Sequence, residues 1–141
     1  MRLAIELDVL GDTRPLWRDW LADAARVLDV EGLPENRAAA AAELDARGAG
    51  NWRTLLERFA EDRAPVYLRP AAEVSAALRA FQREGTSIVV YTDAPAELAR
   101  VALAQLGATR RIVRVEAETA AIDADVVVRT REELLRLRRS V

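Results

Sequence analysis

The chain has 141 residues, which suits one domain with a core of its own, and its composition of 51% hydrophobic and 31% charged residues is that of a globular protein. The formal net charge of −2, with acids and arginines interleaved, argues against nucleic-acid binding, and no apolar run is long enough to cross a membrane. The sequence contains no cysteine, histidine or lysine, which excludes disulfides, imidazole bases and Schiff-base chemistry and leaves hard cations held by oxygen, such as magnesium, as the metals to consider.

The chain begins with a strand that runs into carboxylates. Apolar and more polar residues alternate over positions 2–9, which predicts a β-strand. In such a strand Glu6 and Asp8 would project from the same side. An acid at the carboxyl end of a buried strand is where open α/β sheets place their chemistry, so we expect any catalytic site to lie here.

Three helices are expected next, with no strand between them. The first follows a cap at Asp12 or Thr13, the second covers residues 36–47, and the third begins at Asn51. Their apolar faces carry the three tryptophans of the chain at the spacing of core residues: Trp17, Trp20 and Trp52. We predict that the indoles fill a small helical bundle that lies above the carboxyl ends of the strands as a lid. The same bundle could form a homodimer through an apolar seam.

The remainder of the chain alternates between helices and strands. The expected elements are a helix over 74–81, strands over 87–91, 112–115 and 126–128, a helix opened by residues 92–95 and ended by Gly107, and a last helix that starts with the capping box of residues 130–133. Alternating strands and helices with right-handed crossovers predict a small parallel sheet covered by helices on both faces, which is an α/β fold.

This order of elements resembles the haloacid dehalogenase (HAD) superfamily. The matching features are the acidic first strand with residues 6–15, the helices that directly follow it, and a second strand that ends in Thr92 and Asp93. The resemblance covers roughly residues 1–110. It implies a three-layer, Rossmann-like HAD fold with a reduced parallel sheet, and the parts would be a core of residues 1–13 and 66–141 and a helical cap of residues 14–65.

The resemblance also implies roles for individual residues. In this family the first acid of the motif attacks the substrate, and the second acid, two residues on, protonates the leaving group. Glu6 and Asp8 would then be the catalytic residues and the ligands of a Mg²⁺ ion. Thr92 and Asp93 would hold the phosphoryl group of a small phosphorylated molecule, and Arg14 could hold a substrate carboxylate.

Two registers of the first motif remain open. In one register Glu6 and Asp8 take the places of the two acids, which puts a longer side chain at the nucleophile position, and misplacement by about 1 Å can cost about 100-fold in rate. In the other, Asp8 is the nucleophile and Leu10 replaces the second acid, so general acid catalysis, typically worth about 10²–10⁴-fold, is lost. We prefer the first register because residues 12–15 extend its match.

The last quarter of the chain lacks the family's remaining motifs. A lysine and a later pair of acids would follow Gly107, whereas this segment offers only the arginines Arg110, Arg111 and Arg114 and the scattered acids Glu116, Glu118, Asp123 and Asp125. The sequence therefore predicts a HAD-like protein with incomplete catalytic motifs, impaired in catalysis and acting in binding or assembly. The alternative is a Mg²⁺-dependent hydrolase, either a phosphatase of small phosphate monoesters or a 2-haloacid dehalogenase. No apolar leader opens the sequence, so we expect a cytoplasmic protein without nucleic-acid or membrane partners.

Overall fold

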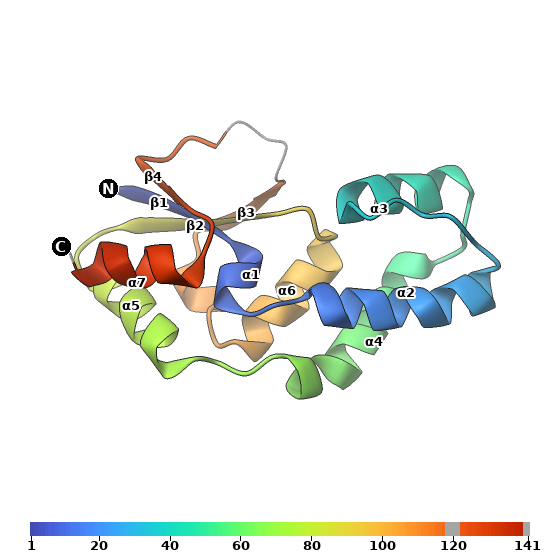
Figure 1. The fold of residues 1–141 in the computed structure, drawn as a ribbon, viewed down its shortest axis with the longest axis horizontal. Helices are drawn as coiled ribbons and strands as arrows, with labels where there is room; N and C mark the ends of the chain where they lie inside the picture. Colours follow the sequence, from blue (N-terminus) through green and yellow to red (C-terminus); the bar gives the residue numbers. More distant parts are fainter. Residues whose placement is uncertain (118–121, 140–141) are drawn as a thin grey trace.

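A four-stranded parallel sheet forms the centre of the molecule in the computed structural model, which describes residues 1–117 and 122–139 (Figure 1). The strands are β1 (Arg2–Glu6), β2 (Ser87–Thr92), β3 (Arg114–Ala117) and β4 (Val126–Val128), in the order β3-β2-β1-β4. β1 pairs with both β2 and β4 and is fully buried at Leu3, Ala4 and Ile5. The parallel α/β architecture expected from the sequence is confirmed.

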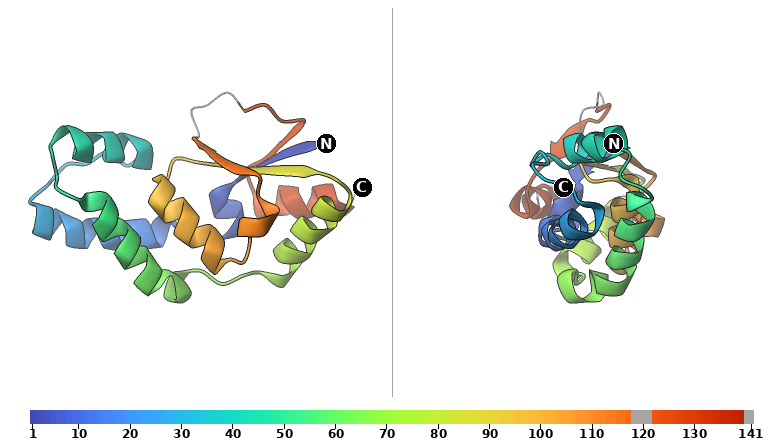
Figure 2. Two further views of the ribbon diagram at one scale, coloured as in Figure 1. Left: turned by 180° about the vertical axis from the view of Figure 1, so that it is seen from behind. Right: turned by 90° about the vertical axis from the view of Figure 1, so that its right-hand side faces the viewer.

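Helices pack against the sheet and continue from its strands. They are α1 (Leu7–Leu10), α5 (Ala72–Arg83), α6 (Ala96–Gln105) and α7 (Arg131–Arg139), with a short 3₁₀ turn, η1 (Thr109–Arg111). In both Figure 1 and Figure 2, α5, α6 and α7 lie along the same side of the sheet, so these three helices do not cover both of its faces as the sequence predicted. The apolar stripe of α5 supplies Phe81 to this layer, which is fully buried.

The three helices between β1 and α5 gather beside the sheet, at the end where β1 and β2 terminate (Figure 1). We call α2 (Arg14–Leu28), α3 (Arg37–Ala46) and α4 (Trp52–Tyr67) the helical insertion. Its interior holds Trp17, Trp20 and Trp52, each at most 4% exposed. The ring centroids of Trp17 and Trp20 lie 5.2 Å apart, and those of Trp20 and Trp52 lie 6.0 Å apart. The indoles are core residues of the insertion, as the sequence predicted.

The first strand is shorter than its alternating pattern suggested. β1 ends at Glu6, and the chain turns at once into α1, whose first turn is capped by the Glu6 side chain as it accepts a hydrogen bond from the backbone N–H of Asp8 at 3.5 Å. Three of the four residues of α1 are buried, so a single helical turn buries these apolar side chains as well as a strand would. Asp8 is therefore a helix residue, and the prediction that it lies on the strand was wrong.

Two further boundaries differ from expectation. Helix α4 continues through Pro65 to Tyr67, two residues past the expected end of the cap at residue 65, and β3 starts at Arg114, two residues later than predicted. No helix within residues 1–117 and 122–139 has the length and apolar character that a membrane span requires.

Candidate functional site

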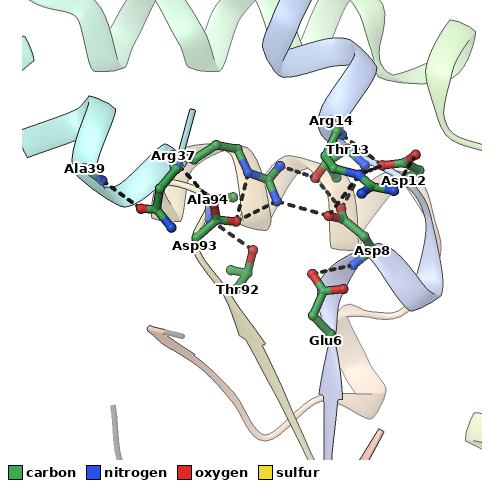
Figure 3. A network of polar contacts seen from close by, with 11 residues as sticks. Glu6, Asp8, Asp12, Thr13, Arg14, Arg37, Ala39, Thr92, Asp93 and Ala94 are labelled. Atoms are coloured by element: carbon green, nitrogen blue, oxygen red, sulfur yellow. Dashed lines mark hydrogen bonds and ion pairs between the residues drawn. The ribbon is translucent and has the colours of Figure 1, made fainter. Parts of the chain in front are cut away.

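A cavity of about 880 Å³ lies between the carboxyl end of β1 and the helical insertion. The residues that line it include two acids from the end of β1 and the start of α1, two arginines of the insertion and one acid that follows β2: Glu6, Asp8, Arg14, Arg37 and Asp93. Figure 3 shows these side chains in one polar network. The structure thus brings together the candidate catalytic residues and two of the three candidate binding residues.

Asp8 is held by donors on both of its carboxylate oxygens. The backbone N–H and the hydroxyl of Thr13 donate to Oδ1 at 2.9 and 2.6 Å, and Nη2 of Arg37 donates to Oδ2 at 3.1 Å. Thr13 is fully buried, and its side chain makes no cap to helix α2 because the hydroxyl turns toward Asp8 instead. Asp8 therefore acts in this network as an acceptor, which is the role of an ionised carboxylate.

Arg37 connects the helical insertion to the sheet. It is the first residue of α3 and is 3% exposed. Besides Asp8, its guanidinium binds Asp93 through Nε at 3.0 Å and Nη2 at 2.9 Å, and Nη1 donates to the hydroxyl of Thr13 at 2.6 Å. One buried guanidinium thus joins α3, the start of α1 and α2, and the end of β2 (Figure 3). Such charge-assisted hydrogen bonds are about twice as strong as neutral ones.

Asp93 lies at the amino end of α3. Its Oδ2 accepts the backbone N–H of Arg37 at 2.9 Å, so the carboxylate satisfies a free donor of the helix and faces its positive end. Burial acts to raise the pKa of Asp93, but the hydrogen bonds and the charge of Arg37 outweigh it and hold the pKa below its ordinary value. Asp93 is therefore ionised and engaged in docking the insertion.

Glu6 is the one acid of the cavity with a strongly raised pKa. Burial and the nearby charge of Asp8 raise the pKa of Glu6 from 4.5 to about 7, against a smaller opposing effect of the Asp8 backbone N–H and of Arg37. An ion pair with a further arginine would lower this pKa again. Arg114 pairs with Glu116, and no ion pair joins Glu6 to Arg129 in the described part of the chain, although Arg129 lines the same cavity.

Arg14 lies at the mouth of the cavity and pairs mainly with its neighbour. Its Nε donates to Asp12 at 2.9 Å, while Asp8 is 3.9 Å away, and its side chain is 66% exposed. The hydrogen bond from Arg14 lowers the pKa of Asp12, and the same pair raises the pKa of Arg14. Arg14 remains the most exposed cation beside Asp8 and is placed to meet an incoming anion.

Thr92 does not face the cavity of Glu6 and Asp8. It is 3% exposed, and its hydroxyl accepts the backbone N–H of Ala94 at 3.0 Å, which forms the turn that precedes α6. Thr92 lines a second cavity of about 680 Å³, between α3 and α6, to which Asp93 also contributes. The structure therefore places the Thr92 hydroxyl in the turn that precedes α6.

The acids and arginines after Gly107 do not complete the site. Arg111 donates to Gln82 at 2.7 Å, and Asp123 and Asp125 bind Arg2 at the far end of the sheet. Glu118 lies outside the described residues. None of these groups that the structure describes lines the cavity of Glu6 and Asp8, whereas Arg129 does.

The site does not fit a magnesium ion as arranged. Within residues 1–117 and 122–139, no three acidic side chains are grouped so that they could hold a metal ion. The guanidinium of Arg37 lies between Asp8 and Asp93 and already balances their charge. The carboxylate oxygens of the described site are thus arranged to bind an arginine, and they do not form the oxygen cage that Mg²⁺ requires.

Arg37 is the functional residue that sequence reasoning missed. Its acidic partners are 29 and 56 positions away, so no local pattern links them. One signal was present: a cation in the first turn of a helix opposes the helix dipole, which favours acids there. An arginine directly after the Asn36 cap therefore had to be stabilised by groups outside its own helix.

Comparison of the sequence with known protein families and with curated proteins finds no match. A search of solved structures finds the crystal structure of a protein from Thermotoga maritima assigned as a beta-phosphoglucomutase, with a TM-score of 0.58, 14% identity and 99% of each chain covered. The chain has a HAD-like Rossmann fold. At this level of identity the likeness concerns the fold, and it confirms the fold class that the resemblance implied.

In this HAD-like fold, β1 ends at Glu6, and the helical insertion lies beside that end of the sheet (Figure 1). The division into a core and a cap at residues 14 and 65 stays a prediction. The helices of the insertion extend from Arg14 to Tyr67, close to the expected limits.

Proposed function

We propose that this HAD-like protein is impaired in phosphoryl-transfer catalysis and acts by binding a small anionic molecule, such as a phosphate monoester, beneath its helical insertion. The observation that carries the proposal is the engagement of Arg37 with both Asp8 and Asp93. Asp8 would have to give a proton to a leaving group, yet donors already occupy both of its oxygens. The acid that the family resemblance would use in catalysis therefore serves to hold the insertion closed.

The state of Glu6 supports the same proposal. It is the last residue of β1, which is the nucleophile position of the first register. With a pKa of about 7, a large share of Glu6 is protonated at neutral pH, and a protonated carboxyl group is a poor nucleophile. The extra methylene of glutamate also displaces the carboxylate from where a shorter acid would reach.

One observation favours the alternative of a working hydrolase. A carboxyl group with a pKa near the operating pH, set in a cavity, is suited to general acid–base catalysis. If the chain is active, Glu6 would be the group that transfers the proton, with Arg14 at the mouth of the cavity holding the anionic end of the substrate.

The turnover experiment compares the wild-type protein with the Asp8→Asn variant in the presence of Mg²⁺, on a panel of small phosphate monoesters and 2-haloacids. We expect both proteins to release phosphate and halide at the same background rate. The exposed Asp23→Asn variant, changed on the outer face of α2, controls for preparation effects. Robust turnover that Asp8→Asn abolishes and Asp23→Asn retains would overturn the proposal in favour of the hydrolase.

The binding experiment uses phenyl phosphate as the probe and thermal unfolding as the measurement. Because only the folded state would bind, saturating probe should raise the free energy of unfolding, by about 2.7 kcal/mol at 100 times the Kd. Arg14→Gln should weaken this effect, since Arg14 is the exposed cation beside Asp8. A wild-type protein that phenyl phosphate does not stabilise, even at tens of millimolar, would contradict anion binding at this site.

Homodimerisation through the helical insertion stays a prediction. Because the three tryptophans are buried inside one chain, the apolar surface available to such a dimer would come from other residues, such as Val27 and Val66, which are 75% and 72% exposed.

A further inference from the structure

Two carboxylates from separate elements converge on a single atom of Arg37. Nη2 lies 3.1 Å from Oδ2 of Asp8 and 2.9 Å from Oδ1 of Asp93. All three groups are largely excluded from solvent: the side chains are 4%, 9% and 19% exposed for Arg37, Asp8 and Asp93. Two buried negative charges at this separation require a cation between them, because an uncompensated buried charge is costly.

We propose that Arg37 is the resident cation of this site and excludes a divalent metal ion from it. An arginine is always charged, and its flat fork of donors can serve two carboxylates at once. Because Arg37 belongs to the same chain and is held in place by α3, it competes with free metal ions at a high effective concentration. The site thereby has its positive charge without taking up a metal.

The distances select an arginine over a metal ion. Contacts of 2.9 and 3.1 Å are the lengths of charge-assisted hydrogen bonds. Mg²⁺ binds oxygen at about 2.0–2.1 Å, so both carboxylates would have to move inward by about 1 Å to hold it. In the wild type neither carboxylate can do so, because the guanidinium of Arg37 lies between them and binds both.

The backbone contact makes the proposal testable by changing the side chain alone. In Arg37→Met the N–H of residue 37 can still donate to Asp93, so α3 keeps one of its attachments to the end of β2. The variant loses the guanidinium and leaves Asp8 and Asp93 without a cation between them. Such a pair of carboxylates attracts either a proton or a hard cation, and an alkaline buffer favours the cation.

The experiment titrates Mn²⁺, a probe that binds oxygen ligands and is detected by electron paramagnetic resonance, into metal-free protein at pH 8. We expect the wild type to show no saturable site that depends on Asp8. Arg37→Met should bind one Mn²⁺ per chain at least about tenfold more tightly than the wild type, a difference of about 1.4 kcal/mol. The gain should vanish when Asp8→Asn is added. Arg37→Gln has the same expectation and replaces Arg37→Met if that variant does not fold.

Arg53→Met is the matched control. Arg53 also bridges two acids, Asp45 at 2.9 Å and Glu97 at 3.2 Å, but its side chain is 43% exposed. Its removal should create no manganese site, because solvent can screen and hydrate the two acids. An Asp8-dependent Mn²⁺ site in the wild type, or folded Arg37 variants that gain no affinity over the wild type, would overturn the proposal. The readout is metal binding, so the result is independent of whether the chain turns over any substrate.

Discussion

Replacing Arg37 by methionine is expected to lower the free energy of unfolding by about 3–5 kcal/mol in metal-free buffer at pH 8, the cost typical of removing one partner of a buried ion pair. Arg37 is 3% exposed and serves Asp8, Asp93 and Thr13 at once. Without it, two largely buried carboxylates and a buried hydroxyl lose their shared partner. Urea unfolding, followed by circular dichroism, measures the change.

A double-mutant cycle separates the ion pair from the packing of the long side chain. In the background of Asp8→Asn and Asp93→Asn, the same replacement of Arg37 should cost much less, because no unpaired carboxylate is left behind. Arg53→Met, which removes a 43% exposed side chain, should cost only about 0.2–1 kcal/mol. Equal costs at Arg37 and Arg53 would show that the network does not stabilise the fold.

Replacing Glu6 by glutamine is expected to stabilise the protein at pH 8 by about 1–2 kcal/mol, because solvent screening of the half-buried side chain reduces the full effect of its pKa shift. The pKa of Glu6 rises from 4.5 to about 7 on folding, and each pKa unit corresponds to about 1.4 kcal/mol. The charged form of Glu6 thus opposes folding because it is half-buried and faces Asp8. Glutamine keeps the shape of the side chain and carries no charge.

The sign of the effect fixes its pH window. Below pH 4.5 Glu6 is protonated in both the folded and the unfolded chain, so its charge does not affect the free energy of unfolding. Between pH 4.5 and about 7 the unfolded chain loses this proton first, so the stability of the folded protein falls as the pH rises. Asp12 and Asp93, whose pKa values are lowered, act in the opposite direction and lose their contribution as pH falls. The difference between the wild type and Glu6→Gln isolates Glu6 from these groups.

Glu35→Gln is the control for this measurement. Glu35 lines the same cavity but is exposed, so its replacement should change stability by no more than about 0.5 kcal/mol. If the free energy of unfolding of Glu6→Gln follows the same pH dependence as that of the wild type, Glu6 is not held in the unfavourable state described. The expected gain also bears on function, because a residue that destabilises a fold in its charged form is typical of a site shaped for a ligand or a reaction.

Most of the fold could be predicted from the sequence because its signals are local. The apolar run of β2, the capping box before α7 and the breaks at glycine each act over a few residues, and the elements appear in the expected order. The end of β1 was misjudged because a short alternating pattern with buried Leu7, Val9 and Leu10 fits a helical turn equally well. The cap was expected to end at residue 65, yet α4 continues through Pro65 to Tyr67.

The candidate site could be predicted only in part, for a physical reason. Glu6 and Asp8 were found because strand ends in parallel sheets are known positions for chemistry. Their partner Arg37 was not, because which arginine of a helical insertion reaches the sheet depends on how the insertion docks. Arg37, whose guanidinium lies 3.1 Å from Asp8, is therefore visible only in the structure.

The confinement of all three tryptophans to α2 and α4 has a practical consequence. Indole emission from this protein originates only in the helical insertion, while the β-sheet carries no such fluorophore. Trp17 also lines the cavity that holds Glu6 and Asp8. Fluorescence can therefore follow loosening of the insertion and occupancy of the cavity without any attached dye, while circular dichroism follows the rest of the chain.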